Sequence, residues 1–279
     1  MLFEKIYNKA SLCREFETEV FKQVQNKNVT IPVYLSAGQE YIPATIAAFV
    51  EDMGFEDRQI FIQHRGHSSY LSFGGDVNEL ILELLGDSEG CANGMGGSAS
   101  IQSKKAKIYG HDGLMGSHGP IAVGMCYANK KPTIVFTGDA AAEEDYFLAS
   151  IAWAATKNLP ILFVVEDNNL SILTEKKVRR SWEMHDVARG FGMTAHDIND
   201  DPNEIIPALK GIFEKPILLN IKTNRMFWHA GAGIDDPNIF DRHKEFAKNL
   251  DTSYVKYTDF ENSNLVRLLW NQAVNRLEK

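Results

Sequence analysis

Two polar side chains, Asp139 and Asn168, each follow a short run of apolar residues that favour β-structure. The segments 133–139 and 161–169 that contain them are nearly continuous hydrophobic runs, which is typical of parallel strands covered on both faces. The segment 140–157 between them is rich in helix-favouring residues. A right-handed crossover would place both strand carboxyl ends at one edge of a sheet, where open α/β sheets bind ligands. We therefore expect a carboxylate and an amide oxygen to converge at that edge.

Such a pair of oxygen ligands suits a hard divalent cation. Mg²⁺ prefers about six oxygens in octahedral geometry and takes several of them from phosphates and water. Asp139, Asn168 and a nearby backbone carbonyl would therefore leave room for a diphosphate. An aspartate at a strand end can instead cap the next helix, and the two residues alone leave both interpretations open.

Length and composition indicate the class of protein. The chain has 279 residues, of which 44% are hydrophobic and 24% charged, as in a soluble globular protein. One α/β domain over residues 1–279, with helical extensions at about 1–27 and 242–279, is the simplest organisation. The net charge of −8 argues against a general nucleic-acid surface, which needs clustered Lys and Arg.

Targeting and redox signals are weak throughout the chain. The three cysteines are scattered without metal-ligand spacing, so we expect reduced thiols rather than disulfides or a zinc site. The first residues lack a basic stretch followed by an apolar one, and no apolar run is long enough to span a bilayer. We expect a cytoplasmic protein without a membrane segment. The basic stretches 104–107 and 176–180 are interpreted as solvated loops.

Hydrophobic periodicity and cap residues predict the remaining elements. Asp76 and Gly86 are the expected start and stop signals of one of the helices. Helices are expected at 1–27, 40–53, 76–85, 121–129, 140–157, 187–191, 203–213 and within 242–279. Strands are expected at 61–63, 133–139, 161–169 and 216–222, and a mobile polar loop at 171–181.

A long glycine-rich loop spans residues 90–119. Its later glycines recur ahead of a predicted helix, so its main chain could approach a ligand closely; these are Gly110, Gly113, Gly116 and Gly119. Loops of this length inside a domain are usually functional. Arg225, Trp228 and His229 follow the last predicted strand and are expected on the same sheet edge as Asp139.

Taken in order, these segments resemble the alpha subunit of the thiamine diphosphate-dependent 2-oxo acid dehydrogenases. That subunit belongs to the decarboxylating first component of pyruvate, acetoin and branched-chain complexes, and the resemblance runs from about Gly38 to Pro237. It implies the thiamine diphosphate-binding fold, a parallel sheet covered by helices on both faces. The matching motifs are Gly38-Gln39-Glu40, His64-Arg65-Gly66-His67, Gly90-Cys91 through Gly96-Gly97-Ser98, Gly113-Leu114-Met115-Gly116, Gly138-Asp139, Glu166-Asp167-Asn168-Asn169, and Arg225 with His229.

The resemblance assigns roles to individual residues. It implies that Mg²⁺ is bound by the side chains of Asp139 and Asn168 and by the carbonyl of Leu170. Arg65 would bind the diphosphate, for which a guanidinium is well suited. The other cofactor-binding residues that the resemblance implies are His64, Gly113, Met115, Gly138, Ala140 and Ala141, the last two at a helix start beneath the diphosphate. The implied catalytic residues are His229, Arg225 and His67.

Several positions depart from the family pattern. Ala140 replaces a glycine, and the acidic run Glu143-Glu144-Asp145 replaces a polar one near the expected diphosphate. Tyr34 stands where pyruvate enzymes have a substrate-facing histidine, and His64 where they have tyrosine. Ala230 replaces the serine that kinases modify in the mitochondrial enzymes. Pyruvate itself is therefore in doubt as the substrate.

The resemblance implies the alpha subunit of an α2β2 heterotetramer that decarboxylates a small 2-oxo acid, active only with a beta subunit. A lipoyl-bearing acyltransferase would be the acceptor partner. One alternative is the cofactor-binding half of a split transketolase or carboligase, which binds sugar phosphates. Another is a non-catalytic assembly subunit, which the acidic run at 143–145 could signal.

Overall fold

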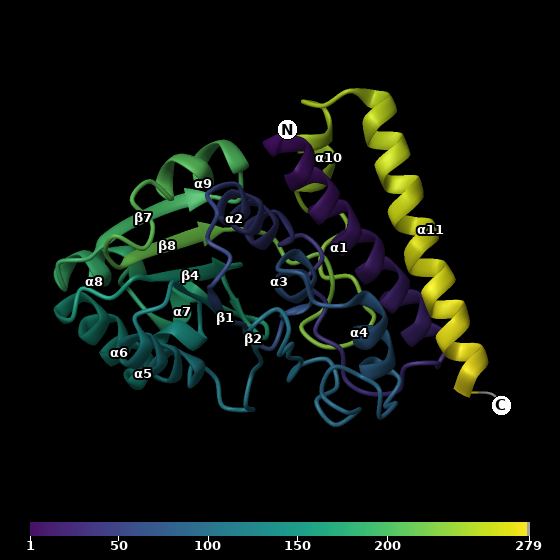
Figure 1. Cartoon of the computed structure of the whole chain (residues 1–279), viewed down its shortest axis with the longest axis horizontal. Coiled ribbons are helices and arrows are strands. Elements are labelled where there is room, and N and C mark those ends of the chain that lie inside the picture. Colours follow the sequence, from purple (N-terminus) through teal and green to yellow (C-terminus); the bar gives the residue numbers. More distant parts are fainter. Residues whose placement is uncertain (278–279) are drawn as a thin grey trace.

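The central element of the fold is a six-stranded sheet with every pair of neighbours parallel (Figure 1). The computed structural model describes residues 1–277. The strand order is β2-β1-β3-β4-β8-β7. The strands are β1 (Gln59–Phe61), β2 (Ile108–Tyr109), β3 (Thr133–Gly138), β4 (Ile161–Asp167), β7 (Thr194–Asn199) and β8 (Ile217–Lys222). The predicted α/β class with a parallel sheet is confirmed.

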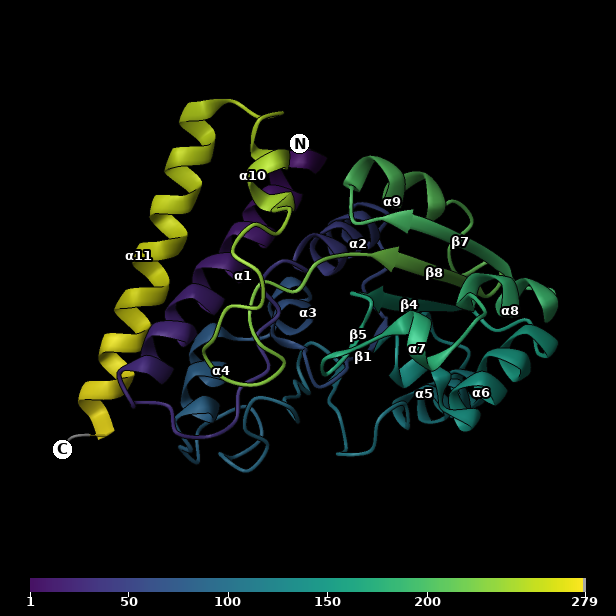
Figure 2. The same cartoon turned by 180° about the vertical axis from the view of Figure 1, so that it is seen from behind.

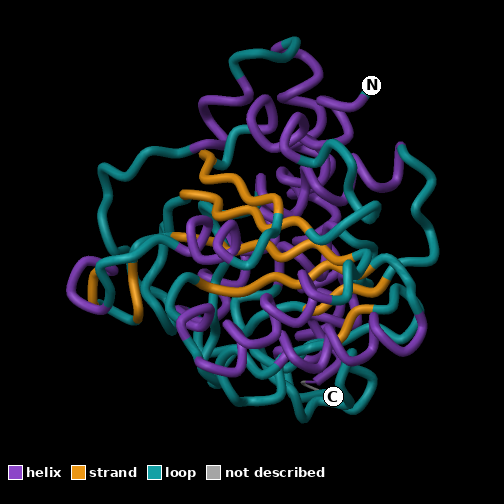
Figure 3. The backbone as a smooth tube through the Cα atoms, turned by 90° about the vertical axis from the view of Figure 1, so that its left-hand side faces the viewer, coloured by secondary structure: helices purple, strands orange, loops and turns teal. Residues whose placement is uncertain are grey.

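Helices cover both faces of this sheet, and the long helices near the two chain ends lie together at one side of the molecule (Figures 1 and 2). They are α1 (Leu2–Gln25), α2 (Tyr41–Asp52), α3 (His67–Ser72), α4 (Val77–Leu84), α5 (His118–Asn129), α6 (Asp145–Thr156), α8 (Met184–Gly190), α9 (Pro202–Ala208), α10 (Arg242–Ala247) and α11 (Thr252–Leu277). Smaller elements are the 3-10 turn η1 (Ala141–Glu143), the hairpin of β5 (Leu170–Ser171) and β6 (Thr174–Glu175), and the single turn α7 (Lys176–Arg179). Figure 3 shows the main strands passing between helices on either side.

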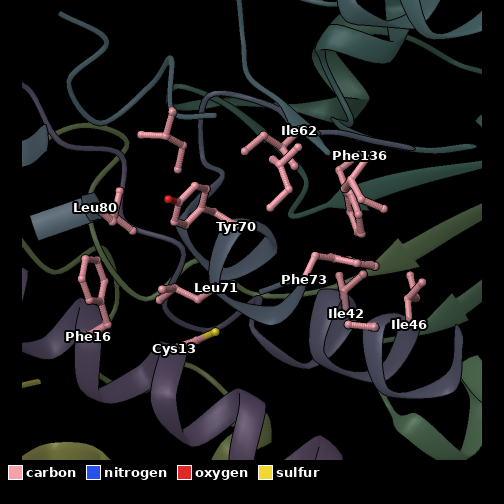
Figure 4. Close-up of a cluster of buried hydrophobic side chains, with 14 of the residues drawn as sticks. Cys13, Phe16, Ile42, Ile46, Ile62, Tyr70, Leu71, Phe73, Leu80 and Phe136 are labelled. Carbon is pink, nitrogen blue, oxygen red and sulfur yellow. The ribbon is translucent and has the colours of Figure 1, made fainter. Parts of the chain in front are cut away.

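The alternation of side chains along a strand supplies both cores. In β3, Ile134 and Phe136 join the core under α2, α3 and α9, while Val135 joins the core under α5, α6 and α8. In β4, Leu162 and Val164 face the first core and Phe163 and Val165 the second; all of these side chains are fully buried. Figure 4 shows part of the first core: side chains of α2 lie beside Phe136, and side chains of α1 lie toward Leu71 of α3.

The helix α1 packs between the sheet's helical layer and α11. Tyr7 and Ser11 of α1 both donate hydrogen bonds to the Asp259 carboxylate of α11, at 3.0 and 2.6 Å. The large Trp270 side chain of α11 is fully buried in the first core. Among the described residues, no helix is both long enough and apolar enough to cross a bilayer.

Some predicted elements are wrong in detail. The helix expected at 140–157 is interrupted, because Glu144 adopts an extended conformation (ψ 137°) between η1 and α6. The mobile loop expected at 171–181 is instead the β5–β6 hairpin followed by α7. The strand expected at 61–63 lies two residues earlier, and the helix expected at 203–213 ends at Ala208. The helical region expected within 242–279 divides into α10 and α11, and residues 278–279 lie outside the described residues.

The buried strands should carry much of the stability. Leu219 of β8 is fully buried in the first core, whereas Leu173 at the β5–β6 turn is 75% exposed. We expect Leu219→Ala to lower the free energy of unfolding by about 2–5 kcal/mol, and Leu173→Ala by less than about 0.5 kcal/mol. Urea denaturation of both variants checks this, and equal effects would contradict the assigned core.

Candidate active site at the carboxyl edge of the sheet

A pocket of about 400 Å³ opens at the carboxyl ends of β1, β3 and β4. It is formed by the segments that follow these strands, together with Met115 of the glycine-rich loop, Arg179 of α7 and His229. The predicted site residues that line it are His64, Arg65, Met115, Gly138, Asp139, Ala140, Ala141, Asn168, Leu170 and His229. Gly113, Arg225 and His67 do not line it.

Asp139 lies at the centre of the pocket's charges. Its side chain is only 2% exposed and accepts a hydrogen bond from the Arg179 guanidinium, which also donates to Glu143. Arg180 donates to the backbone carbonyl of Asp139 at 3.1 Å. Burial raises the pKa of Asp139 to about 6, and the nearby Asp167 carboxylate adds to this rise.

Asn168 has a defined orientation beside Asp139. Its amide Nδ2 donates to Gln39 Oε1 at 3.0 Å, and its Oδ1 accepts the backbone N–H of Leu170 at 3.1 Å. Asp139, Asn168 and Leu170 thus bring a carboxylate, an amide oxygen and a backbone carbonyl to one pocket. The residues from 1 to 277 contain no cluster of three or more His, Cys, Asp or Glu that could bind a metal. An ion here would therefore depend on mixed oxygen ligands.

Arg65 provides a buried positive charge in the lining of the same pocket. One guanidinium nitrogen donates to the Leu35 carbonyl at 2.9 Å, and another contacts His229 at its Nδ1 and its carbonyl, both at 3.2 Å. Burial, followed by repulsion from Arg225, lowers the pKa of Arg65 to about 10. The guanidinium therefore stays charged at neutral pH and is suited to an anion.

The rings of His64 and His229 line the pocket, and the ring of Tyr34 packs against both. The ring centroid of Tyr34 lies 5.0 Å from that of His64 and 5.7 Å from that of His229, and the two histidine centroids are 5.7 Å apart. Burial and then the Arg65 charge lower the pKa of His64 to about 2 and that of His229 to about 4. Both rings are therefore neutral at pH 7. The buried His64 nitrogens have no hydrogen-bond partner among residues 1–277.

The protein family follows from a comparison over most of the chain. The model of the family described as "Dehydrogenase E1 component" matches residues 8–258. This chain belongs to that family.

Relatives agree with this assignment. The chain is 31% identical over 194 residues to the alpha subunit of acetoin:2,6-dichlorophenolindophenol oxidoreductase from Cupriavidus necator, covering 67% of this chain and 57% of that protein. It is 28% identical over 230 residues to the pyruvate dehydrogenase E1 component subunit alpha from Rickettsia typhi, covering 77% and 68% respectively. The predicted resemblance to 2-oxo acid dehydrogenase alpha subunits is confirmed, and the match to the Cupriavidus protein spans less than two thirds of that protein.

Solved structures support the fold. Transketolase from Campylobacter jejuni superimposes with a TM-score of 0.59 at 16% identity, covering 98% of this chain and 48% of that one. Transketolase from Leishmania mexicana gives a TM-score of 0.59 at 14% identity, with 98% and 47% covered. At such identities the likeness shows the fold alone.

In this E1-family chain, His67 does not line the pocket, and its implied catalytic role stays a prediction. The side chain is fully buried, with Nδ1 3.3 Å from Glu17 Oε2 and Nε2 2.9 Å from Ser98 Oγ. Glu17 also accepts hydrogen bonds from the backbone and side chain of Ser36. His67 therefore joins α1 and the 34–36 segment to the loop that carries Arg65.

Arg225 also lies behind the pocket wall instead of lining it. Its side chain is 1% exposed; Nε donates to Asp235 at 2.6 Å, and Nη2 donates to the Ile172 carbonyl at 3.0 Å. Because Ile172 lies at the turn of the β5–β6 hairpin, Arg225 fixes that turn over the pocket. The structure thus places Arg225 behind the hairpin, and its implied catalytic role stays a prediction.

The first part of the glycine-rich loop, residues 90–97, serves another purpose than ligand contact. The fully buried Glu83 carboxylate of α4 accepts the backbone N–H groups of Ala92, Gly94, Gly96 and Gly97 at 2.7–3.0 Å. The loop from 90 to 97 thus wraps a carboxylate of the protein itself. Gly113 is exposed, whereas Gly116 (φ +80°) packs so closely that a Cβ would lie 2.7 Å from the Ala141 carbonyl.

Sequence reasoning places the acidic run that contains Glu143 near the expected diphosphate but misses Arg179 as a pocket residue. The stretch 176–180 was interpreted as a solvated loop, yet Arg180 is buried and Lys176 donates to Asp167 at 2.8 Å. The available signal was the pairing of an acidic run at 143–145 with a basic one at 176–180. Such complementary runs indicate contact only if the chain brings them together. The β5–β6 hairpin does this, because it turns the chain back before α7.

Glu83→Gln should destabilise the glycine-rich loop. A glutamine can accept with one oxygen only, so two of the four N–H groups would lose their partner, and hydrogen bonds to a charged group are worth about 1.5–3 kcal/mol each. We expect a loss of roughly 3 kcal/mol and faster protease cleavage within 90–97. Glu79→Gln, on the exposed side of α4, is the matched control. Equal thermal unfolding of the two variants would show that Glu83 does not organise the loop.

Proposed function

We propose that this chain is the alpha subunit of a thiamine diphosphate- and magnesium-dependent 2-oxo acid dehydrogenase. The observation that supports it best is that Asp139, Asn168, Leu170 and Arg65 all line one pocket. Oxygen ligands for a hard cation and a buried guanidinium thus line one space, which suits a metal-bound diphosphate.

The pocket residues fit the proposed cofactor. Mg²⁺ would be held by Asp139, Asn168 Oδ1 and the Leu170 carbonyl, with Arg65 on the diphosphate. The unpartnered nitrogens of His64 are free to bond a polar ligand group, which would remove the cost of a buried ring without hydrogen bonds. Gly138 lies beside this space, where an added Cβ would already approach Gln63 Oε1 to 3.2 Å.

The chain's own residues would bind and orient the reactants. Thiamine diphosphate, when bound, supplies the carbon nucleophile and the electron sink that decarboxylation of a 2-oxo acid requires. Because Arg65 donates to Nδ1 of the neutral His229, the ring proton of His229 lies on Nε2. His229 can therefore donate that proton to an oxygen of the substrate.

A second polypeptide completes the proposed enzyme. The cofactor ring needs a carboxylate partner and an enclosing wall, which this family draws from a beta subunit. The relatives from Cupriavidus and Rickettsia are both named as alpha subunits. We therefore propose an α2β2 assembly in the cytoplasm that acts on a small 2-oxo acid and passes the acyl group to a lipoyl-bearing acyltransferase.

One observation favours a second candidate, a non-catalytic assembly subunit. The Arg179 guanidinium donates a hydrogen bond to the carboxylate of Asp139, the residue proposed to bind the metal. A member of the family that had lost its cofactor would be expected to neutralise this buried carboxylate from within. Binding of thiamine diphosphate separates the two candidates.

Asp139→Ala and Asn168→Ala test the proposed function. In the complex purified with its partner, each should weaken magnesium-dependent thiamine diphosphate binding by more than about tenfold, because even outer-shell partners of a metal contribute that much. Asp186→Ala, which removes an exposed carboxylate on α8, is the control. Calorimetry with and without Mg²⁺ measures the affinities. Wild-type affinity in both variants would refute the site, and no binding by the wild type would favour the non-catalytic subunit.

A further inference from the structure

Arg179 connects two acidic side chains inside the pocket. Its Nη2 donates to Asp139 and its Nη1 to Glu143, while its buried Nε has no partner among residues 1–277. The side chains of Arg179, Asp139 and Glu143 are 12%, 2% and 21% exposed. A guanidinium with an unused donor thus stands at the pocket wall, between the proposed metal ligand and the acidic run.

The backbone around Arg179 is fixed on both sides. Lys176 at the start of α7 donates to Asp167 at 2.8 Å and to Glu183 at 2.9 Å. Arg180 is held by the Asp139 carbonyl at 3.1 Å and lies 4.7 Å from the centre of the Trp182 ring. The Arg179 side chain can therefore change partner without movement of α7.

A metal ion bound to Asp139 would weaken the ion pair between Asp139 and Arg179. A guanidinium and a divalent cation repel each other strongly at contact distance in a poorly solvated pocket. Metal binding would therefore weaken the Arg179–Asp139 pair, while Glu143 would keep the guanidinium at the pocket wall. The diphosphate would enter the same space and offers the acceptor oxygens that Arg179 then lacks.

We propose that Arg179 is a second diphosphate-binding residue, released from Asp139 by the metal and held in place by Glu143. This inference rests on the proposed function of the pocket. It accounts for the acidic Glu143 beside an anion site, because Glu143 holds the guanidinium that binds the anion. It also couples the two ligands, since the metal frees the group that the diphosphate needs.

Arg179→Gln should shift the two affinities in opposite directions. Removal of the competing cation should tighten binding of Mn²⁺ alone by about fivefold, and loss of the anion contact should weaken Mn²⁺-dependent binding of inorganic diphosphate by a similar or larger factor. Free Mn²⁺ is measured by electron paramagnetic resonance on the full chain, and diphosphate by calorimetry. Lys177→Gln, whose parent side chain on α7 is 76% exposed, is the matched control.

Glu143→Gln provides a second variant if Arg179→Gln folds poorly. It should weaken diphosphate binding without tightening Mn²⁺ binding. Arg179 would still pair with Asp139 and compete with the metal, but it would lose the Glu143 carboxylate that holds it at the pocket wall. Unchanged affinities in Arg179→Gln, or weaker binding of both ligands, would overturn the proposal. Thiamine diphosphate, tested separately on the complex with its partner, distinguishes the proposals. Arg179→Gln could tighten Mn²⁺ binding and weaken inorganic diphosphate binding while the wild-type complex fails to bind thiamine diphosphate. In that case the role of Arg179 stands and the proposed function fails.

Discussion

The parallel register between β3 and β4 is the constraint on which the site depends. Gly138 pairs with Glu166 in that register, so the chain leaves both strands at nearly the same level, and Asp139 and Asn168, which follow within two residues, line one pocket. The crossover through α6 sets the direction of both strands, and burial of alternate side chains in two cores prevents a shift by one residue. A slip of one residue in either strand would exchange its side chains between the two cores and separate the polar residues at the edge.

Charge compensation is the second constraint on this edge. Asp139, Asp167 and Glu143 lie close together in a poorly solvated region, where uncompensated carboxylates would be costly. The hairpin and α7 bring Lys176, Arg179 and Arg180 against them. Arg225 fixes the hairpin turn from behind, so residues outside the pocket determine the position of charges within it.

The sequence predicted those parts of the fold that depend on local pattern. The central strands and the cap of α4 follow from apolar runs and from Asp76, whose side chain accepts the backbone N–H groups of Asn78 and Glu79. The strand β7 was missed because His196, Asp197 and Asn199 interrupt its apolar character. An edge strand has one neighbour and partial exposure, so polar residues are tolerated in it.

The sequence indicated which motifs belong to the candidate site, but not which residues of each motif line the pocket. His64 and His67 share one motif, yet His64 lines the pocket and His67 is buried against Glu17 and Ser98. That division depends on α1, which is distant in sequence. In the same way, the glycine-rich pattern of 90–97 indicated a loop whose backbone N–H groups bind an anion. They do bind a carboxylate, but it is that of Glu83 in the protein itself.

The central claim is that the ends of β3 and β4 form a metal–diphosphate site. Anomalous diffraction from crystals of the complex with its partner, grown with Mn²⁺ and thiamine diphosphate, tests it most directly. The account predicts a manganese peak about 2.0–2.5 Å from Asp139 Oδ1 or Oδ2, Asn168 Oδ1 and the Leu170 carbonyl, with the diphosphate between the ion and Arg65. A peak at other residues, or a bound cofactor with no metal at Asp139, would contradict it.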